Sequence, residues 1–390
     1  MINRRAFLSL GAATAWAVDA ANYQNKKNLL FYIDSKGRTR PVRTAADWRH
    51  RVQHLRANME LVMGELPPVS AEPADLLVAE ETRLSRYTRQ RVTFVPEKGD
   101  RVPAFLLIPH DRATPRPAMI CLPGSSKPGK DVPVGLAPNR PDQVWAHELA
   151  ELGFVCLVLD YPLVHTLEYG TDPYAMGYDS ATMKGIVNHR RGIDVLQSLP
   201  YVAPNRIGVI GHSLGGHNAL FLAAFDERIK AIVSSCGFNV FAKHAGGDIS
   251  AWSSRYYMPR IKSVYGNDPA KLPFDFTEVL ASLAPRAVFV NAPLHDQPDF
   301  EVSGVRDCVE AAFPVYRDIF RAGDKLVVQY PDAKHEFPKA QRDAAYRVLG
   351  GALASFASQE RRFGATCPAM PASYVWGMGS NGAMNSLAEN

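Results

Sequence analysis

A chain of 390 residues with 46% hydrophobic and 21% charged residues has the composition of a folded globular protein, with room for one large domain with extensions or two smaller ones. Its net charge of +5 is mild and no long lysine or arginine run occurs, which argues against a nucleic-acid partner. The five cysteines are scattered, without a C-x-x-C or histidine-rich metal pattern, so we expect no disulfide framework, no metal and no other cofactor.

The first 20 residues have the pattern of an export signal. The pair Arg4-Arg5 precedes a modest apolar stretch over residues 6–18, and Ala15-Trp16-Ala17 offers a cleavage site of small residues. We therefore expect residues 1–20 to be a twin-arginine-type signal peptide, which would place the mature protein in the periplasm or outside the cell. The stretch is too short to span a bilayer, so stable membrane insertion is not expected. The alternative is an uncleaved N-terminal helix.

An extension over residues 21–85 is expected to contain one amphipathic helix. From Ala45 to about Gly64, apolar residues recur at spacings of three and four: Trp48, Val52, Leu55, Met59 and Val62. The prolines of Leu66-Pro67-Pro68 then stop the helix. We expect it to cap the main domain and not to form a domain of its own.

Residues 86–360 alternate strand and helix patterns and form the expected catalytic domain. A hairpin of strands 91–95 and 102–108 comes first, followed by expected strands at 117–122, 155–159, 206–211, 231–235, 287–290 and 326–330. Helical patterns occupy 145–152, 181–199, 304–320 and 339–357. This alternation predicts an α/β fold with a mostly parallel, twisted sheet and helices on both faces. Residues 361–390 have no periodicity and are expected to be a mobile tail.

The candidate nucleophile is Ser213. The strand 206–211 ends in Gly211-His212-Ser213-Leu214-Gly215, a G-x-S-x-G pattern, and the chain continues into a helical run from Asn218. Strand, tight turn and helix are the context of a nucleophile elbow. The flanking glycines are compatible with such a turn, because a Cβ at either position would collide with the adjoining strand or helix.

A serine hydroxyl needs a base, and the base needs a carboxylate that orients it. Both groups are expected at the carboxyl ends of strands. His335 lies in a polar loop after the strand 326–330 and is the expected base. Asp296 follows the strand 287–290 and is the expected acid, with Asp299 as the alternative because Gln297-Pro298 leaves the loop geometry open.

The oxyanion of the reaction needs two backbone N–H donors. One is expected from Leu214, directly after the nucleophile. The other is expected from Ser125, in the loop that follows the strand 117–122.

The order Ser213, Asp296, His335 resembles that of the α/β-hydrolase superfamily, over about residues 86–357. Within it, the elbow and the segment 331–338 are most similar to the dienelactone hydrolase and acetyl xylan esterase-like group, related to the catalytic domains of prolyl oligopeptidases. The chain departs from many relatives at Pro123, where they carry a histidine before the glycine of the oxyanion loop. The resemblance implies the α/β-hydrolase fold and a serine-dependent hydrolysis.

Two long segments, 161–179 and 238–283, follow strands at the same edge and are expected to form a lid or side wall. Candidate substrate contacts within them are chosen because aromatic rings stack on sugars and arginine binds carboxylates: Trp252, Arg255, Tyr257 and Tyr178. The alternative is that these side chains pack their own loops.

The sequence therefore predicts a hydrolase of carboxylic esters, such as acetyl or methyl esters of carbohydrates, acting through an acyl-enzyme on a small-molecule or carbohydrate substrate. A peptidase of the prolyl oligopeptidase type is one alternative, although the extension 21–85 is too short for the propeller such enzymes carry. A non-catalytic binding protein on the same fold is the other, although it would normally have lost the serine, the histidine or the elbow glycines. No oligomeric state is predicted.

Overall fold

The structure is a computed structural model and describes residues 20–70, 72–137, 143–296 and 298–353. The expected tail 361–390 lies outside these residues, as does the expected signal peptide apart from its last residue. Within the described part of the chain, no helix has the length and apolar content needed to cross a membrane.

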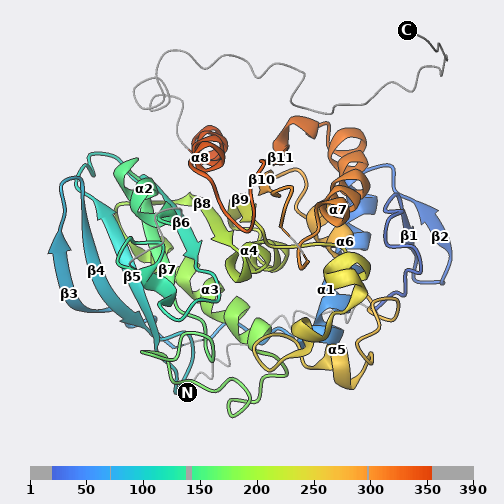
Figure 1. Cartoon of the computed structure of the whole chain (residues 1–390), viewed down its shortest axis with the longest axis horizontal. Helices are drawn as coiled ribbons and strands as arrows, with labels where there is room; N and C mark the ends of the chain where they lie inside the picture. Colours follow the sequence, from blue (N-terminus) through green and yellow to red (C-terminus); the bar gives the residue numbers. More distant parts are fainter. Residues whose placement is uncertain (1–19, 71, 138–142, 297, 354–390) are drawn as a thin grey trace, which may run out of the picture.

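A nine-stranded sheet in the order β11-β10-β9-β8-β6-β7-β5-β4-β3 organises the described residues (Figure 1). Strands β6 to β11 pair in parallel, and β5, β4 and β3 continue the sheet antiparallel. Their bounds are β3 Leu77–Arg83, β4 Tyr87–Phe94, β5 Val102–Pro109, β6 Arg116–Leu122, β7 Val155–Leu159, β8 Val202–His212, β9 Ile229–Ser235, β10 Ala287–Asn291 and β11 Leu326–Gln329. A separate hairpin pairs β1 Phe31–Ile33 with β2 Thr39–Pro41.

Helices cover both faces of the sheet (Figure 1). They are α1 Ala45–Met63, α2 Trp145–Glu151, α3 Ala181–Ser198, α4 Leu214–Phe225, α5 Arg260–Ser263, α6 Phe276–Ser282, α7 Val302–Pro314 and α8 Lys339–Leu353. Shorter helical turns are η1 Gly129–Asp131, η2 Phe241–Gly247, η3 Ser250–Ser253, η4 Val315–Ile319 and η5 Gly323–Lys325.

The two faces of the sheet build two apolar clusters, as the alternation along β6 shows. Ile120 and Leu122 belong to the cluster that includes α1, α3, α4 and α6, whereas Met119 and Cys121 belong to the one that includes α2 and α8. β6 is buried at every position, and after Arg116 its sequence is a continuous apolar run with no polar face. The predicted fold class, a mostly parallel sheet with helices on both faces, is confirmed.

Helix α1 occupies the range over which the apolar spacing predicts a helix, and it is joined to the main domain. It begins with a capping box in which Thr44 and Asp47 bond each other's backbone N–H groups. Its Arg51 forms a buried ion pair with Glu278 of α6, with Nη2 and Oε1 2.7 Å apart. Removing one member of a buried pair of this kind costs about 3–5 kcal/mol, so α1 is anchored where it lies.

Candidate active site

Ser213 occupies a sharp turn between β8 and α4. Its backbone has φ 56° and ψ −119°, in the positive-φ region that non-glycine residues rarely adopt, and its N–H donates to the carbonyl of Ser235 at 2.9 Å. A Cβ added to Gly211 would lie 2.2 Å from the carbonyl oxygen of Gly215, and one added to Gly215 would lie 2.1 Å from that of Leu122. Only glycine fits at either flank, which gives the G-x-S-x-G pattern its steric basis.

His335 and Asp296 meet beside this turn. His335 Nδ1 lies 2.8 Å from Asp296 Oδ1; the carboxylate is buried, whereas 42% of the histidine side chain is exposed. An Nδ1–H donated to the carboxylate fixes the tautomer and leaves Nε2 as a proton acceptor. The imidazole is confined by the ring of His212, 4.8 Å away between centroids, and by the stacked ring of Phe300 at 5.7 Å.

Asp299, the alternative acid, lies elsewhere. It is exposed, and its charge acts on His244. Within the described residues, the carboxylate that hydrogen-bonds His335 is that of Asp296. The geometry therefore brings together Asp296 and His335 and leaves Asp299 apart.

The two expected oxyanion donors flank the elbow. Leu214 is the first residue of α4, and Ser125 is exposed in the loop after β6. This loop lies against the elbow, since a Cβ added to Gly124 would be 3.7 Å from Ser213 Cβ. Neither the Leu214 nor the Ser125 N–H donates a hydrogen bond within the described part of the chain, so both are free to bind a substrate oxygen.

His165 holds this loop, and the sequence analysis did not single it out. It is buried, Tyr161 N–H donates to its Nδ1 at 3.1 Å, and its Nε2 lies 3.0 Å from the carbonyl oxygen of Gly124. Because a carbonyl oxygen can only accept, Nε2 carries a proton and donates it to the Gly124 carbonyl, while Nδ1 also lies 3.2 Å from Asp160 Oδ1. In a trans peptide the C=O and the following N–H point in opposite directions. Fixing the Gly124 carbonyl therefore also fixes the direction of Ser125 N–H.

Cys236 is a second neighbour that the sequence analysis did not single out. It follows β9 directly, has φ 49°, and its Sγ contacts the carbonyl of Glu336 at 3.4 Å. Burial raises the pKa of the Cys236 thiol, and the negative charge of Asp296 adds to the effect. The thiol is therefore neutral in the absence of a metal ion.

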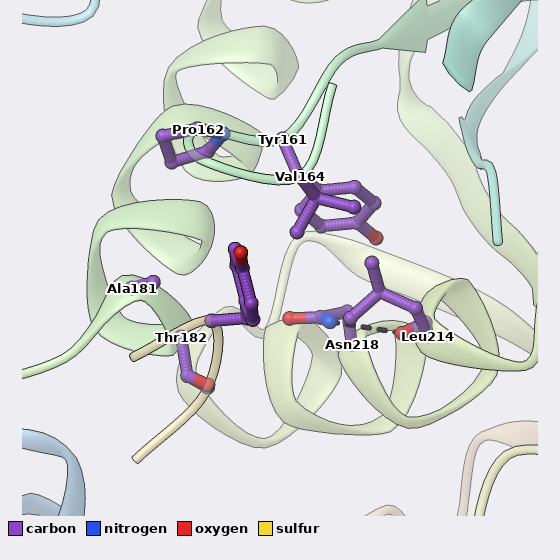
Figure 2. A pocket seen from close by; sticks show the side chains of 8 residues that line it. Tyr161, Pro162, Val164, Ala181, Thr182, Leu214 and Asn218 are labelled. Atoms are coloured by element: carbon purple, nitrogen blue, oxygen red, sulfur yellow. Dashed lines mark hydrogen bonds between the residues drawn. The ribbon is translucent and has the colours of Figure 1, made fainter. Parts of the chain in front are cut away.

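A small pocket opens beside the elbow (Figure 2). Its lining includes Leu214 and Asn218 of α4, and the Asn218 side-chain amide donates to the Leu214 carbonyl at 2.9 Å. The other lining residues come from three segments: Tyr161, Pro162, Val164, Ala181, Thr182 and Tyr256. Both long segments that were expected to border the site, 161–179 and 238–283, contribute to the lining, together with the first turn of α3. Tyr256 lines it, although sequence reasoning had selected its neighbours.

The four candidate substrate contacts do not line this pocket. Trp252 is buried, with its ring 4.7 Å from that of His217, and Tyr257 is half-buried beside both. Tyr178 donates its hydroxyl to Glu97 at 2.6 Å. Arg255 is exposed and pairs with Asp172 at 3.1 Å. In these contacts each side chain packs or anchors its own loop, which was the alternative to a role in substrate binding.

Comparisons with known proteins place the fold among hydrolases of esters. The family model described as "Glucuronyl esterase, fungi" matches residues 185–319. A glucuronoyl esterase from Solibacter usitatus superposes with a TM-score of 0.69 at 19% identity, covering 86% of this chain and 99% of that one. A carbohydrate esterase family 15 glucuronoyl esterase from Caldicellulosiruptor kristjansonii has a TM-score of 0.63 at 17% identity, covering 89% and 95%.

Among curated sequences, protein PA2218 of Pseudomonas aeruginosa is 29% identical over 156 residues. That alignment covers 40% of this chain and 38% of the relative, so the chain spans well under half of PA2218. Together with the sheet order and the elbow, the structural matches define the class: this chain has the α/β-hydrolase fold. The fold that the resemblance implied is therefore confirmed.

Proposed function

We propose that this protein is a serine hydrolase of carboxylic esters that acts on carbohydrate esters through an acyl-enzyme on Ser213. The observation that carries the proposal is the 2.8 Å hydrogen bond between His335 and Asp296 at the edge of the sheet where the elbow presents Ser213. The family match and the structural neighbours, which are esterases, support the same reaction class.

In this mechanism the Ser213 hydroxyl attacks the ester carbonyl while His335 Nε2 takes its proton. Asp296 stabilises the imidazolium that forms. The oxyanion of the tetrahedral intermediate accepts hydrogen bonds from the N–H groups of Leu214 and Ser125. Collapse expels the alcohol, which receives the proton from His335. Water then attacks the acyl-enzyme with His335 again as base and releases the acid.

For the substrate we propose esters in which a sugar acid, such as glucuronic acid, supplies the acyl group. This choice rests on the match to the glucuronyl esterase family over residues 185–319, which include the elbow and Asp296. Acetyl esters of sugars are the competing substrate class on the same fold.

The test compares the wild type with Ser213→Ala on three substrates: an alkyl ester of glucuronic acid, an acetylated xylo-oligosaccharide and 4-nitrophenyl acetate. We expect the glucuronate ester to give the highest kcat/KM and Ser213→Ala to lose at least about 10⁴-fold on every ester. Retained turnover in a folded Ser213→Ala protein would refute the mechanism. Preference for the acetylated sugar would refute only the substrate assignment, and peptide amides cleaved as fast as esters would favour the peptidase alternative.

We also propose that the protein is exported through a twin-arginine-type signal. The support is the Arg4-Arg5 pair before a short apolar stretch. In an expressing bacterium, replacing both arginines by lysine should leave the precursor in the cytoplasm, whereas unchanged fractionation would contradict the proposal.

A further inference from the structure

Three potential metal ligands meet beside the elbow. Cys236 Sγ, a carboxylate oxygen of Asp296 and a ring nitrogen of His335 all lie within 4.8 Å of one another. They follow β9, β10 and β11, which are neighbours in the sheet, so the cluster is built by strand order. Cys236 and Asp296 are buried, whereas the exposed side of His335 gives an ion a route from solvent.

The carboxylate of Asp296 is only half satisfied. Oδ1 accepts from His335, whereas Oδ2 is buried and accepts no hydrogen bond of normal geometry from the residues that the structure describes. The other donor beside this carboxylate is the Cys236 thiol, which is a weak one. A buried carboxylate oxygen without a donor is costly, and a cation is one of the few groups that satisfies it.

The chemistry of the three donors matches zinc. Thiolate, imidazole and carboxylate are the side chains that bind Zn²⁺, and a site with three protein ligands keeps a fourth position for water. Zinc–ligand bonds of about 2.0–2.3 Å place neighbouring ligand atoms about 3.3–3.8 Å apart. The 2.8 Å contact between His335 Nδ1 and Asp296 Oδ1 must therefore open slightly for both atoms to bind one ion, and the exposed side of His335 leaves room for a small rotation of its ring.

We propose that Cys236, Asp296 and His335 form a Zn²⁺ site, and that the bound ion blocks ester hydrolysis by occupying the base and the acid of the reaction. On binding, the Cys236 thiol loses its proton to solvent and its sulfur forms a bond to the ion. His335 then has no free nitrogen placed to take the proton of Ser213. The inhibition rests on the proposed function, whereas the binding does not.

Binding is tested with Co²⁺ as a spectroscopic probe of Zn²⁺ sites, using the Ser213→Ala protein so that the result does not depend on catalysis. We expect a near-ultraviolet thiolate-to-cobalt charge-transfer band that is lost on adding Zn²⁺. The band should be absent from Ser213→Ala with Cys236→Ala. It should remain in Ser213→Ala with Cys308→Ala, since Cys308 is another free, buried cysteine. No band in Ser213→Ala, or a band that survives removal of Cys236, would overturn the site.

Inhibition is tested by titrating Zn²⁺ into the wild type, Cys236→Ala and Cys308→Ala during ester hydrolysis. Loss of a direct ligand should raise the half-inhibitory Zn²⁺ concentration of Cys236→Ala by at least about tenfold, with Cys308→Ala unchanged. Equal inhibition of all three would overturn the inhibitory role. Should Cys236→Ala fold poorly, as its circular dichroism would show, Cys236→Ser provides the same comparison with a smaller change in shape.

Discussion

His335 and Asp296 are 39 residues apart in sequence, yet Nδ1 of one lies 2.8 Å from Oδ1 of the other. The reason is the sheet: β10 and β11 are adjacent and parallel, so the loops that follow them leave from the same edge. A backbone hydrogen bond of 2.9 Å from Leu294 N to Pro331 O ties the two loops together. The position of the pair is therefore set by strand order and loop pairing.

The assignment of the acid is tested by a matched pair of variants. Asp296→Asn should lower kcat by about 10³–10⁴-fold, because the amide neither stabilises the imidazolium nor holds the required tautomer. Asp299→Asn should lower it by less than about threefold. Both kcat values are measured on one ester. The assignment fails if Asp299→Asn is the damaging change.

The elbow glycines are predicted to be indispensable for folding. Gly215→Ala places a Cβ 2.1 Å from the Leu122 carbonyl, a backbone atom that cannot move away without disturbing β6. We expect a loss of more than about 3 kcal/mol in the free energy of unfolding.

The control is Gly351→Ala in α8. An added Cβ there meets nothing within 4 Å, so a gain of about 0.5–1 kcal/mol is expected from helix propensity. Urea unfolding measures both variants, and a Gly215→Ala protein as stable as the wild type would contradict the steric account.

His165 is predicted to act as a positioning residue through the Gly124 carbonyl. His165→Leu removes the donor, so Ser125 N–H loses its fixed direction and kcat should fall by about 10- to 100-fold with little change in KM. His165→Gln retains an N–H donor and should recover part of the loss. Steady-state kinetics on the folded variants test this role. Equal losses of kcat in the two variants, or a change confined to KM, would argue against it.

Because two of its histidines are buried, we expect the protein to lose stability in acid. His189 and His217 have no hydrogen-bond partner for either ring nitrogen among the described residues, and burial lowers the pKa of each to about 3. In the unfolded chain each has its ordinary pKa of 6.5. Below pH 6.5 the unfolded state therefore binds protons that the folded state does not, and the free energy of unfolding falls as the pH drops toward 3.

Each of the two contributes a loss of about 2 kcal/mol between pH 7 and pH 5. With His189→Leu, the loss in the free energy of unfolding between pH 7 and pH 5 should be smaller by about 2 kcal/mol, as measured by urea unfolding at the two pH values. The exposed His50→Gln is the control and should leave the loss unchanged. An identical pH dependence in wild type and His189→Leu would contradict the prediction.

The central strands and the elbow were predictable because local sequence determines them. A strand buried on both faces, such as β7, has a continuous apolar sequence. The elbow requires glycines at fixed positions, and these can be recognised in the sequence. Edge strand β3 was missed because it is exposed along its whole length and is held by backbone pairing to β4, which leaves no apolar pattern.

The surroundings of the site could not be predicted because they depend on three-dimensional packing. Nothing in the segment 161–179 shows that His165 reaches across to the Gly124 carbonyl, and nothing near Cys236 shows that its sulfur lies beside Asp296. The choice between Asp296 and Asp299 also required coordinates, because both follow the same strand within one loop.

Labelling with a fluorophosphonate, followed by mass spectrometry of the peptides, tests most directly whether Ser213 is a nucleophile activated by His335. Such a reagent modifies a serine only where a base activates its hydroxyl and an oxyanion site receives the phosphoryl oxygen. One adduct is expected, on Ser213, and it should disappear in His335→Ala. A folded wild-type protein that remains unlabelled at Ser213, or that is labelled equally well without His335, would contradict this prediction.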